Sequence, residues 1–432
     1  MQLQQQRSGN FRWSICALLF FATTINYLDR QVLGLLKPTL EGEFGWTESQ
    51  YSYIVMAFTA SYAVGLVVFG RFIDKIGTRL GYTISITVWS IAAMAHAAVK
   101  STFGFGIART ALGLGESGNF PAAIKTVAEW FPKKERALAT GILDSGSNIG
   151  ACVAPILIPW LLGWYGWQEA FLITGALGFI WLVAWRLLYQ TPGKHKKLSK
   201  PEYDYIHSDN EAADGDTGKL NWGRLFKHKP TWVFIVGKFF TDPIWYFFMY
   251  WLPSYFSTTF HLDLKKPSLP LVIVYTGATI GAIGGGWLSS WLIKKGWLVH
   301  RSRKFTMLLS ALCVVPIILA RFTDNIWMVV ALITLAIVGN AAWSANVYTL
   351  VSDMLPKKAV SSVIGIGGMA GAIGGVLFPL AIGIILDYYK GLDNILAGYN
   401  IIFAFCAVSF LIAWGLMHWI SPKMDPVAAN KL

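Results

Sequence analysis

The sequence is poor in charged residues. Only 14% of its 432 residues are Asp, Glu, Lys or Arg, whereas about 25% are charged in an average soluble protein. Hydrophobic residues make up 55% of the chain, which excludes an ordinary soluble domain and predicts an all-α membrane protein. Apolar stretches long enough to cross about 30 Å of hydrocarbon recur twelve times, near 13–36, 50–70, 80–99, 103–125, 138–162, 168–189, 231–256, 268–293, 305–321, 326–351, 360–386 and 398–420.

Other scarce features exclude further classes of protein. No Gly-x-x-x-x-Gly-Lys-Ser/Thr motif is present, which argues against a pump driven by ATP. Glycine-rich stretches at 281–286 and 365–375 predict close helix packing, as small residues do in membrane helices. They are not dinucleotide-binding motifs, because no strand precedes them. We expect no cofactor and no metal site. The few cysteines all fall in apolar stretches, where we interpret them as packing residues: Cys16, Cys152, Cys313 and Cys406.

The placement of the basic residues matters more than the net charge of +13. Lys and Arg crowd alternate connections between the apolar stretches, which is the positive-inside pattern of a multi-pass membrane protein. We therefore expect no binding to nucleic acid, and we place both termini and the long central loop in the cytoplasm. The opposite connections carry few cations: Lys37, Lys100, Lys265, Lys266, Arg321 and Lys390.

The chain divides into two related halves. We predict a six-helix bundle over 1–190, a cytoplasmic linker over 191–229 and a second six-helix bundle over 230–432. Within the linker, Ser199 is expected to cap a short surface helix at Pro201. Residues 129–134 reappear as 353–358 at an offset of 224. Same-sense repetition of six spans is typical of transporters that hold substrate at the midplane between two bundles.

Two pairs of charges lie inside apolar stretches. Arg109 and Glu116 are seven residues apart, which places them on one helix face roughly 10 Å apart. Asp29 and Arg30 lie in the first stretch. Charged groups at membrane depth are costly unless they face a partner or a wet cavity. We expect both pairs to face one central polar cavity.

Arg30 is the residue that we expect to bind an anionic substrate. Its guanidinium is planar and permanently charged, which suits a carboxylate, and the adjacent Asn26 and Tyr27 add hydrogen-bond donors. We hypothesise that the substrate carboxylate competes with Asp29 for Arg30. Proton binding by Asp29 and Glu116 would then depend on the substrate, because a buried carboxyl group is sensitive to a nearby cation.

The second half offers neutral groups in place of these charges. At the offset of 224, Glu116 corresponds to Asn340, so we expect the second bundle to contact substrate hydroxyls. Lys238 and Asp242, at i and i+4, are interpreted as a mutually satisfied pair. The further candidates for substrate contact are Ser147 and Asn148 in the first half and Trp245, Tyr246, Asn340, Trp343, Ser344 and Asn346 in the second.

The connection at 70–79 resembles the loop signature of the major facilitator superfamily, Gly-x-x-x-Asp-Arg/Lys-x-Gly-x-Arg/Lys. This resemblance implies the two-bundle fold of that superfamily. Physically, the carboxylate of this loop can meet a helix N-terminus or a cation and form a latch that breaks as the bundles move. The residues that carry the signature are Gly70, Asp74, Lys75, Gly77 and Arg79.

Residues 26–30, 109–121 and 130–136 resemble the anion:cation symporter branch of that superfamily, and 238–253 is similar to its hexuronate transporters. The resemblance implies a monomeric, multi-pass protein of a bacterial inner membrane that carries a sugar acid with protons. One departure is Asp144, where a neutral amide is expected. The resemblance further implies these roles: substrate contact for Tyr27, Arg30 and Tyr62, proton transfer for Asp29 and Glu116, and interaction of Arg109 with either acid.

Our prediction is therefore proton-coupled symport of a sugar-acid monocarboxylate such as glucuronate or galacturonate. The alternatives are an exchanger of organic anions or phosphate esters, and a sensor that binds without translocating. An intramembrane serine protease is the enzyme alternative, because Ser117 lies in a Gly-x-Ser-Gly pattern. Such a protease needs a His partner, and His96 and His418 are the His residues in or near the apolar stretches. We do not expect an enzyme.

Overall fold

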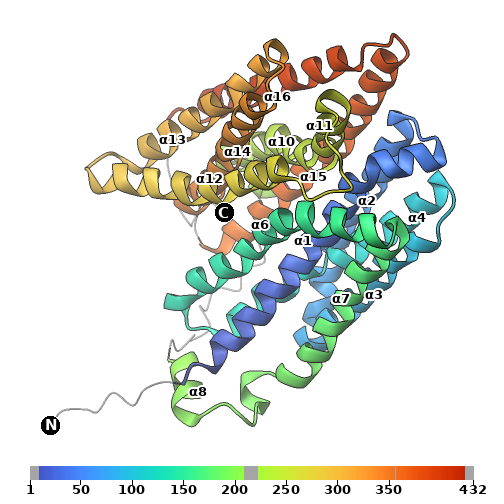
Figure 1. Cartoon of the computed structure of the whole chain (residues 1–432). Coiled ribbons are helices and arrows are strands. Elements are labelled where there is room, and N and C mark those ends of the chain that lie inside the picture. The colour runs from blue at the N-terminus through green and yellow to red at the C-terminus, as the bar shows by residue number, and fades with distance from the viewer. Residues whose placement is uncertain (1–8, 209–221, 356, 424–432) are drawn as a thin grey trace. The chain divides into compact units, whose positions relative to one another are not determined.

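The computed structural model is built from helices. It describes residues 9–208, 222–355 and 357–423, and these residues form no β-strand. In this part of the chain, ten helices are long and apolar enough to cross a membrane (Figure 1), which confirms an all-α membrane protein. The α-helices are α1 (Phe11–Phe44), α2 (Glu48–Ile76), α3 (Thr78–Ala95), α4 (Thr102–Glu116), α5 (Asn119–Trp130), α6 (Lys133–Trp164), α7 (Trp167–Leu188), α8 (Lys200–Ile206), α9 (Trp222–Leu225), α10 (Lys229–Tyr250), α11 (Leu252–Phe260), α12 (Leu269–Lys294), α13 (Val299–Val314), α14 (Ile326–Met354), α15 (Lys357–Lys390) and α16 (Ile395–Ile420).

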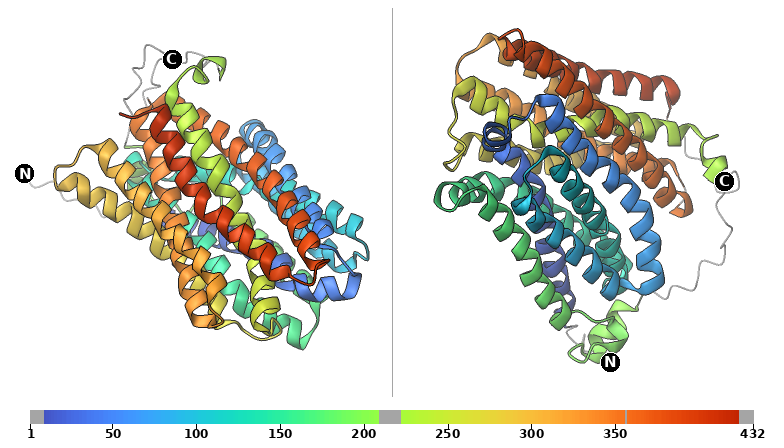
Figure 2. Two further views of the ribbon diagram at one scale, coloured as in Figure 1. Left: turned by 90° about the horizontal axis from the view of Figure 1, so that it is seen from above. Right: turned by 90° about the vertical axis from the view of Figure 1, so that its right-hand side faces the viewer.

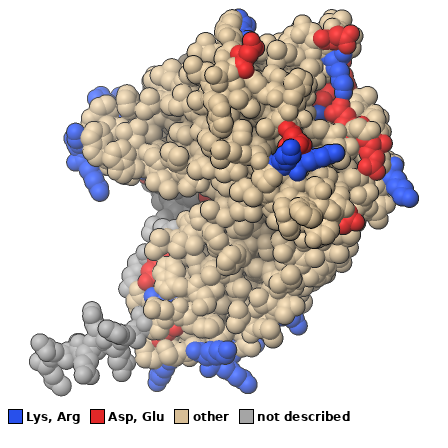
Figure 3. Space-filling view, in the orientation of Figure 1, with Lys and Arg blue, Asp and Glu red and all other residues tan. Residues whose placement is uncertain are grey.

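The surface and the helices agree with the predicted apolar stretches. On the face drawn in Figure 3, uncharged side chains cover wide continuous areas, as lipid contact requires. Two predicted spans are divided: α4 and α5 share the span near 103–125, and α10 and α11 share the span near 231–256. Pro253 lies in the first turn of α11, where its missing N–H costs no helical hydrogen bond. The count of twelve spans stays a prediction.

The chain forms two compact units, which are described separately. Unit 1 comprises Met1–Val32, Ser61–Ala154 and Trp164–Thr217, and unit 2 comprises Leu33–Ala60, Pro155–Gly163 and Gly218–Leu432. Helices α1, α2 and α6 each contribute residues to both units. The predicted bundle boundaries at 190 and 230 stay a prediction.

The helix boundaries repeat at the offset seen in the sequence. Helix α5 ends at Trp130 and α14 ends at Met354, while α6 begins at Lys133 and α15 begins at Lys357. Both pairs of positions differ by 224, the spacing of the sequence match. The internal repeat therefore extends from sequence to helix boundaries.

Glycines allow close helix contacts in each unit. A Cβ added to Gly150 of α6 would lie 2.5 Å from the carbonyl oxygen of Thr24 in α1. A Cβ added to Gly374 of α15 would lie 2.5 Å from the carbonyl oxygen of Phe239 in α10. Figure 2 shows α10, α15 and α16 running side by side in unit 2. Glycine thus serves helix packing, as small residues do in membranes.

The described part of the linker is anchored to unit 1. Ser199 accepts a hydrogen bond from the backbone N–H of Glu202 at 3.4 Å, which confirms the predicted cap of α8. The carboxylate of Glu202 pairs with Arg12 of α1 at 3.1 Å, and Arg12 also pairs with Glu135 of α6 at 2.8 Å. These buried contacts fix the start of the linker against α1 and α6.

Candidate functional site

The most buried ion pair of unit 1 joins α1 to α4. The Nε of Arg30 lies 2.5 Å from Oε2 of Glu116, with side-chain exposures of 4% and 0%. Glu116 is at the end of α4, and Arg109 lies seven residues, or about two turns, earlier. Both side chains are buried. Such burial is expensive for a pair of ions unless their geometry is good, so its retention points to a role beyond stability.

Two tyrosines flank the guanidinium of Arg30. Its Cζ lies 4.8 Å from the ring centroid of Tyr27 in α1 and 4.5 Å from that of Tyr62 in α2. Both tyrosines are half-buried, whereas Arg30 is buried. Aromatic faces favour a cation at these distances, so the rings hold the guanidinium plane and form its more accessible border.

Asp29 and Arg109 complete the cluster of charges. Asp29 is 2% exposed, and its carboxylate interacts with the hydroxyl of Thr174 in α7. It interacts electrostatically with Glu116 and with Arg109, and Arg109 also acts on Glu116. The four charges predicted from the sequence therefore lie in one electrostatic network within unit 1.

The pairing within this network differs from our hypothesis in one respect. We expected Asp29 to compete with the substrate for Arg30, but the ion-pair partner of Arg30 is Glu116. Asp29 and Arg30 are adjacent in α1, and neighbouring side chains on a helix diverge by about 100°, so they point away from each other. Competition between a substrate and an acidic residue for Arg30 stays a prediction, and Glu116 is the carboxylate that the structure pairs with Arg30.

The α6 candidates have different surroundings. The hydroxyl of Ser147 donates to the carbonyl oxygen of Asp144 at 2.6 Å, so its proton is already used within α6. Asn148 is half-buried, and Asp144 has an exposed side chain. The Asn148 amide is therefore the better candidate to form hydrogen bonds with a ligand than the Ser147 hydroxyl.

In unit 2, Lys238 and Asp242 of α10 form the predicted pair. The Lys238 Nζ lies 2.8 Å from Oδ1 of Asp242, and it also donates to the hydroxyl of Tyr348 in α14 at 2.9 Å. The next turn of α10 presents Trp245 and Tyr246, both half-buried. The charges of the pair cancel, so this part of unit 2 is close to neutral, as predicted for a bundle that contacts hydroxyls.

The α14 candidates separate into two kinds. Asn346 is fully buried and donates to the carbonyl oxygens of Gly285 and Ala342 at 3.1 and 2.9 Å. Trp343 is buried and packs edge-on against Phe410. This packing favours a structural role for Asn346 and Trp343. Asn340, at 8% exposure, and the half-buried Ser344 stay candidates for substrate contact.

Comparison with known proteins bears on this arrangement. The Major Facilitator Superfamily profile matches residues 19–379 and 295–431. The chain belongs to the Major Facilitator Superfamily. It is 32% identical to the hexuronate transporter of Escherichia coli (strain K12) over 420 residues, covering 96% of this chain and 95% of that protein. It is 33% identical to the galacturonate transporter of Dickeya chrysanthemi over 308 residues, covering 70% and 89% respectively. The protein is therefore a transporter of this superfamily and not an enzyme.

Solved structures share the superfamily fold. A bacterial homolog of the human lysosomal transporter Spinster, in an inward-facing and occupied conformation, has a TM-score of 0.79 at 18% identity and covers 98% of this chain and 100% of that one. A D-xylose-proton symporter has a TM-score of 0.75 at 15% identity and covers 97% and 100%. At these identities the likeness shows the fold alone, which confirms the predicted class.

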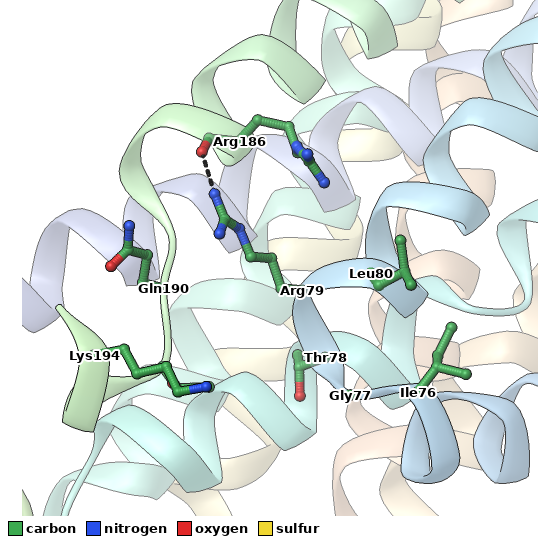
Figure 4. Close-up of a pocket in the computed structure, with 9 residues that line it drawn as sticks. Ile76, Gly77, Thr78, Arg79, Leu80, Arg186, Gln190 and Lys194 are labelled. Atoms are coloured by element: carbon green, nitrogen blue, oxygen red, sulfur yellow. Dashed lines mark hydrogen bonds between the residues drawn. The ribbon is translucent and has the colours of Figure 1, made fainter.

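The superfamily loop signature lies between α2 and α3, as predicted. Gly77 has φ of +84°, a conformation that favours glycine over other residues. A guanidinium nitrogen of Arg79 donates to the carbonyl oxygen of Arg186 at 2.8 Å and so attaches the loop to α7 (Figure 4). Lys75 is exposed. Gly70 and Asp74 lie within α2, but the side chain of Asp74 is outside the description, so the predicted latch is not tested.

Ser117 and His96, the residues of the serine-protease alternative, make contacts that do not join them to each other. Ser117 donates its hydroxyl proton to the carbonyl oxygen of Leu114 at 2.6 Å. His96 is fully buried and stacks on Phe171 at 4.9 Å. In the described part of the chain, no three His, Cys, Asp or Glu side chains are grouped to hold a metal ion.

Sequence reasoning missed a buried ionic cluster in unit 2. Lys37, which we assigned to a connection, lies within α1 at 1% exposure. Its ammonium donates to Glu48 at 2.7 Å, to Glu41 at 3.2 Å and to Ser254 at 3.1 Å. The backbone N–H of Glu48 donates to Asp387 of α15 at 2.6 Å. The helical register of Lys37 with Glu41, four residues apart, was the one signal in the sequence.

Proposed function

We propose that this protein carries a sugar-acid monocarboxylate, such as a hexuronate, together with protons by alternating access. One observation carries the proposal: Arg30 is a buried, permanently charged cation whose counter-ion is the side-chain carboxylate of Glu116. A guanidinium binds a ligand carboxylate through two parallel hydrogen bonds. The sugar-acid transporters among its relatives support this class of substrate.

Coupling to protons follows from the exchange of partners. When the substrate carboxylate binds Arg30, Glu116 loses its cation while it remains at 0% exposure. An ionised carboxylate in such a site is costly, and the group becomes neutral by taking up a proton. Substrate and proton therefore bind together, with Asp29 and Arg109 adjusting the charge balance through their interaction with Glu116.

The neutral polar groups complete substrate recognition in this proposal. Tyr27 and Tyr62 border the carboxylate end through their place beside Arg30. Within unit 1, the half-buried Asn148 contacts sugar hydroxyls. Within unit 2, Asn340 and the half-buried Tyr246 are the candidates for hydroxyl contact. A sugar in an apolar setting needs such hydrogen-bond partners for every hydroxyl that loses water.

We further propose a monomer in a bacterial inner membrane with both termini in the cytoplasm. The excess of Lys and Arg in the connection at 70–79 and in the linker supports this orientation. The connection at 70–79 then lies on the cytoplasmic side, and the carboxylate of Asp74 forms the latch between transport states. Cysteine labelling of a Lys196→Cys variant, whose position in the linker is exposed, from each side of sealed vesicles would test the orientation.

Uptake into proteoliposomes tests the function. We expect labelled glucuronate or galacturonate to accumulate when the external medium is acidic, and we expect Arg30→Gln to abolish accumulation. Arg321→Gln removes an exposed arginine and serves as the matched control, which should accumulate as the unmodified protein does. If Arg30→Gln still accumulates substrate at the unmodified rate, the proposed carboxylate site is wrong.

Counterflow distinguishes the symporter from the alternatives. A symporter accumulates label under a proton gradient without substrate inside the vesicles, an exchanger requires internal substrate, and a sensor moves no label in either condition. Binding shifts in melting temperature across a panel of sugar acids would then identify the preferred substrate.

A further inference from the structure

A pocket of 470 Å³ opens beside the superfamily loop signature in unit 1. It lies where α2 ends, α3 begins and α7 passes into the linker (Figure 4). The pocket shares Gly77 and Arg79 with the connection that carries the proposed latch, but it contains none of the residues proposed to bind the sugar acid or protons. Its lining residues are Ile76, Gly77, Thr78, Arg79, Leu80, Arg186, Gln190, Thr191 and Lys194.

The charged lining of the pocket is entirely basic. Arg79, Arg186 and Lys194 contribute three cations, and no Asp or Glu whose side chain the structure describes lines the pocket. The nearby carboxylate of Glu129 is occupied, because it accepts hydrogen bonds from Thr78 at 2.7 Å and from Tyr189 at 2.5 Å. The three cations therefore share a concave site, and the described side chains of its wall supply no counter-ion, which favours an anion.

Hydrogen-bond donors of the pocket remain available. The Nε of Arg79 is buried and has no hydrogen-bond partner among the described residues. The amide groups at the start of α3 add to it, because Gly77 supplies no side-chain cap and the first N–H groups of a helix have no partner within the helix. Figure 4 shows Lys194 extending toward this end of α3. These donors suit oxygens of a phosphate group.

The surroundings place the pocket at the edge of the lipid. Leu80, which lines the pocket, is 46% exposed, and Val183 and Leu187 on α7 are 60% and 76% exposed. Exposed apolar side chains on membrane-spanning helices face acyl chains. Arg186 itself is exposed and lies beside Leu187 near the end of α7. A ligand here would have its anionic group in the pocket and an apolar portion along α3 and α7.

We propose that this pocket binds the phosphate headgroup of an anionic phospholipid. Basic pockets at the water interface of membrane helices recognise such headgroups. Arg79 and Arg186 contact the phosphate oxygens, Lys194 adds charge from the linker, and the acyl chains lie against Leu80 and Leu187. A bound lipid would tie the loop signature to the start of the linker.

Lipid titration of the purified protein in detergent tests the site. The probes are phosphatidylglycerol, phosphatidylcholine and soluble glycerol phosphate, and the readout is the apparent Kd from thermal melting together with lipid retention in native mass spectrometry. We expect phosphatidylglycerol to bind most tightly. In Arg186→Gln/Lys194→Gln its affinity should fall by about tenfold or more, because two surface cations are lost.

Lys196→Gln/Lys197→Gln is the matched control, because it removes two exposed lysines of the same linker that do not line the pocket. It should weaken phosphatidylglycerol binding by less than about twofold. Equal weakening in both variants, or none in the pocket variant, would overturn the site. Binding of phosphatidylcholine or glycerol phosphate as tight as that of phosphatidylglycerol would overturn its assignment to an anionic lipid. Arg186 and Lys194 are exposed, so the variants should fold.

Discussion

Replacing Lys37 with methionine should destabilise the protein strongly, even though the substitution adds apolar character to a membrane helix. The ammonium of Lys37 has three oxygen partners, Glu48, Glu41 and Ser254. Lys37 and Glu48 have side-chain exposures of 1% and 2%. Without Lys37, the carboxylate of Glu48 keeps the hydrogen bond from the indole of Trp251 at 3.2 Å but loses its nearest cation.

The expected magnitude follows from this burial. Removing one partner of a buried ion pair costs about 3 to 5 kcal/mol, whereas removing both often costs little. Solvent screening gives no reason to lower this figure, since both side chains are almost inaccessible. We expect Lys37→Met to cost about 3 kcal/mol or more. The double variant Lys37→Met/Glu48→Gln should be more stable than Lys37→Met alone.

Equilibrium unfolding in mixed micelles of sodium dodecyl sulfate and a mild detergent measures these free energies. Lys390→Met, which removes the more exposed cation beside Glu41, is the control and should cost less than about 1 kcal/mol. The single variant Glu48→Gln completes the comparison. The reasoning fails if the losses of unfolding free energy in Lys37→Met and Glu48→Gln simply sum to the loss in the double variant. It also fails if Lys37→Met costs no more than the control.

Three further predictions concern other contacts. Asp242→Asn should be about 1 kcal/mol less stable than Lys238→Met/Asp242→Asn, because the single variant leaves the Lys238 charge without its partner. The difference is small because Asp242 is 28% exposed and solvent screens the pair. The same unfolding assay measures both stabilities, and equal values would contradict the prediction. Arg30→Lys should raise the KM for uptake about tenfold or more, because an ammonium cannot bind a carboxylate through two parallel hydrogen bonds; an unchanged KM would argue against direct contact. Gly150→Ala and Gly374→Ala should each lower the melting temperature, because the added Cβ meets backbone at 2.5 Å and costs about 1 to 3 kcal/mol; unchanged melting would show that the helices separate easily.

The positions of the membrane helices could be predicted because hydrophobic length is a strong signal. The repeat at 129–134 and 353–358 also predicted matching helix boundaries, since Lys133 and Lys357, the first residues of α6 and α15, occupy equivalent places. The charged residues of α1 and α4 could be selected because isolated ions at membrane depth are costly. These features depend on local sequence alone.

The partners of those charges could not be predicted, because they depend on the rotation of one helix against another. Arg30 and Arg109 are both plausible partners for Glu116 by sequence, and the rotation of α1 against α4 gives this role to Arg30. Lys37 follows an apolar stretch and was assigned to a connection, yet α1 continues to Phe44 and buries it. The same limit applies to Asn346, whose contact with α12 depends on how closely Gly285 lets α14 approach.

Simultaneous recording of sugar-acid uptake and internal pH in proteoliposomes tests the proposed exchange of partners at Arg30. The unmodified protein should acidify the lumen as it accumulates hexuronate. Glu116→Gln should still bind and equilibrate the substrate but should neither acidify the lumen nor accumulate substrate against its gradient, and Asp29→Asn should reduce accumulation. Unchanged proton-driven accumulation in both variants would contradict the mechanism.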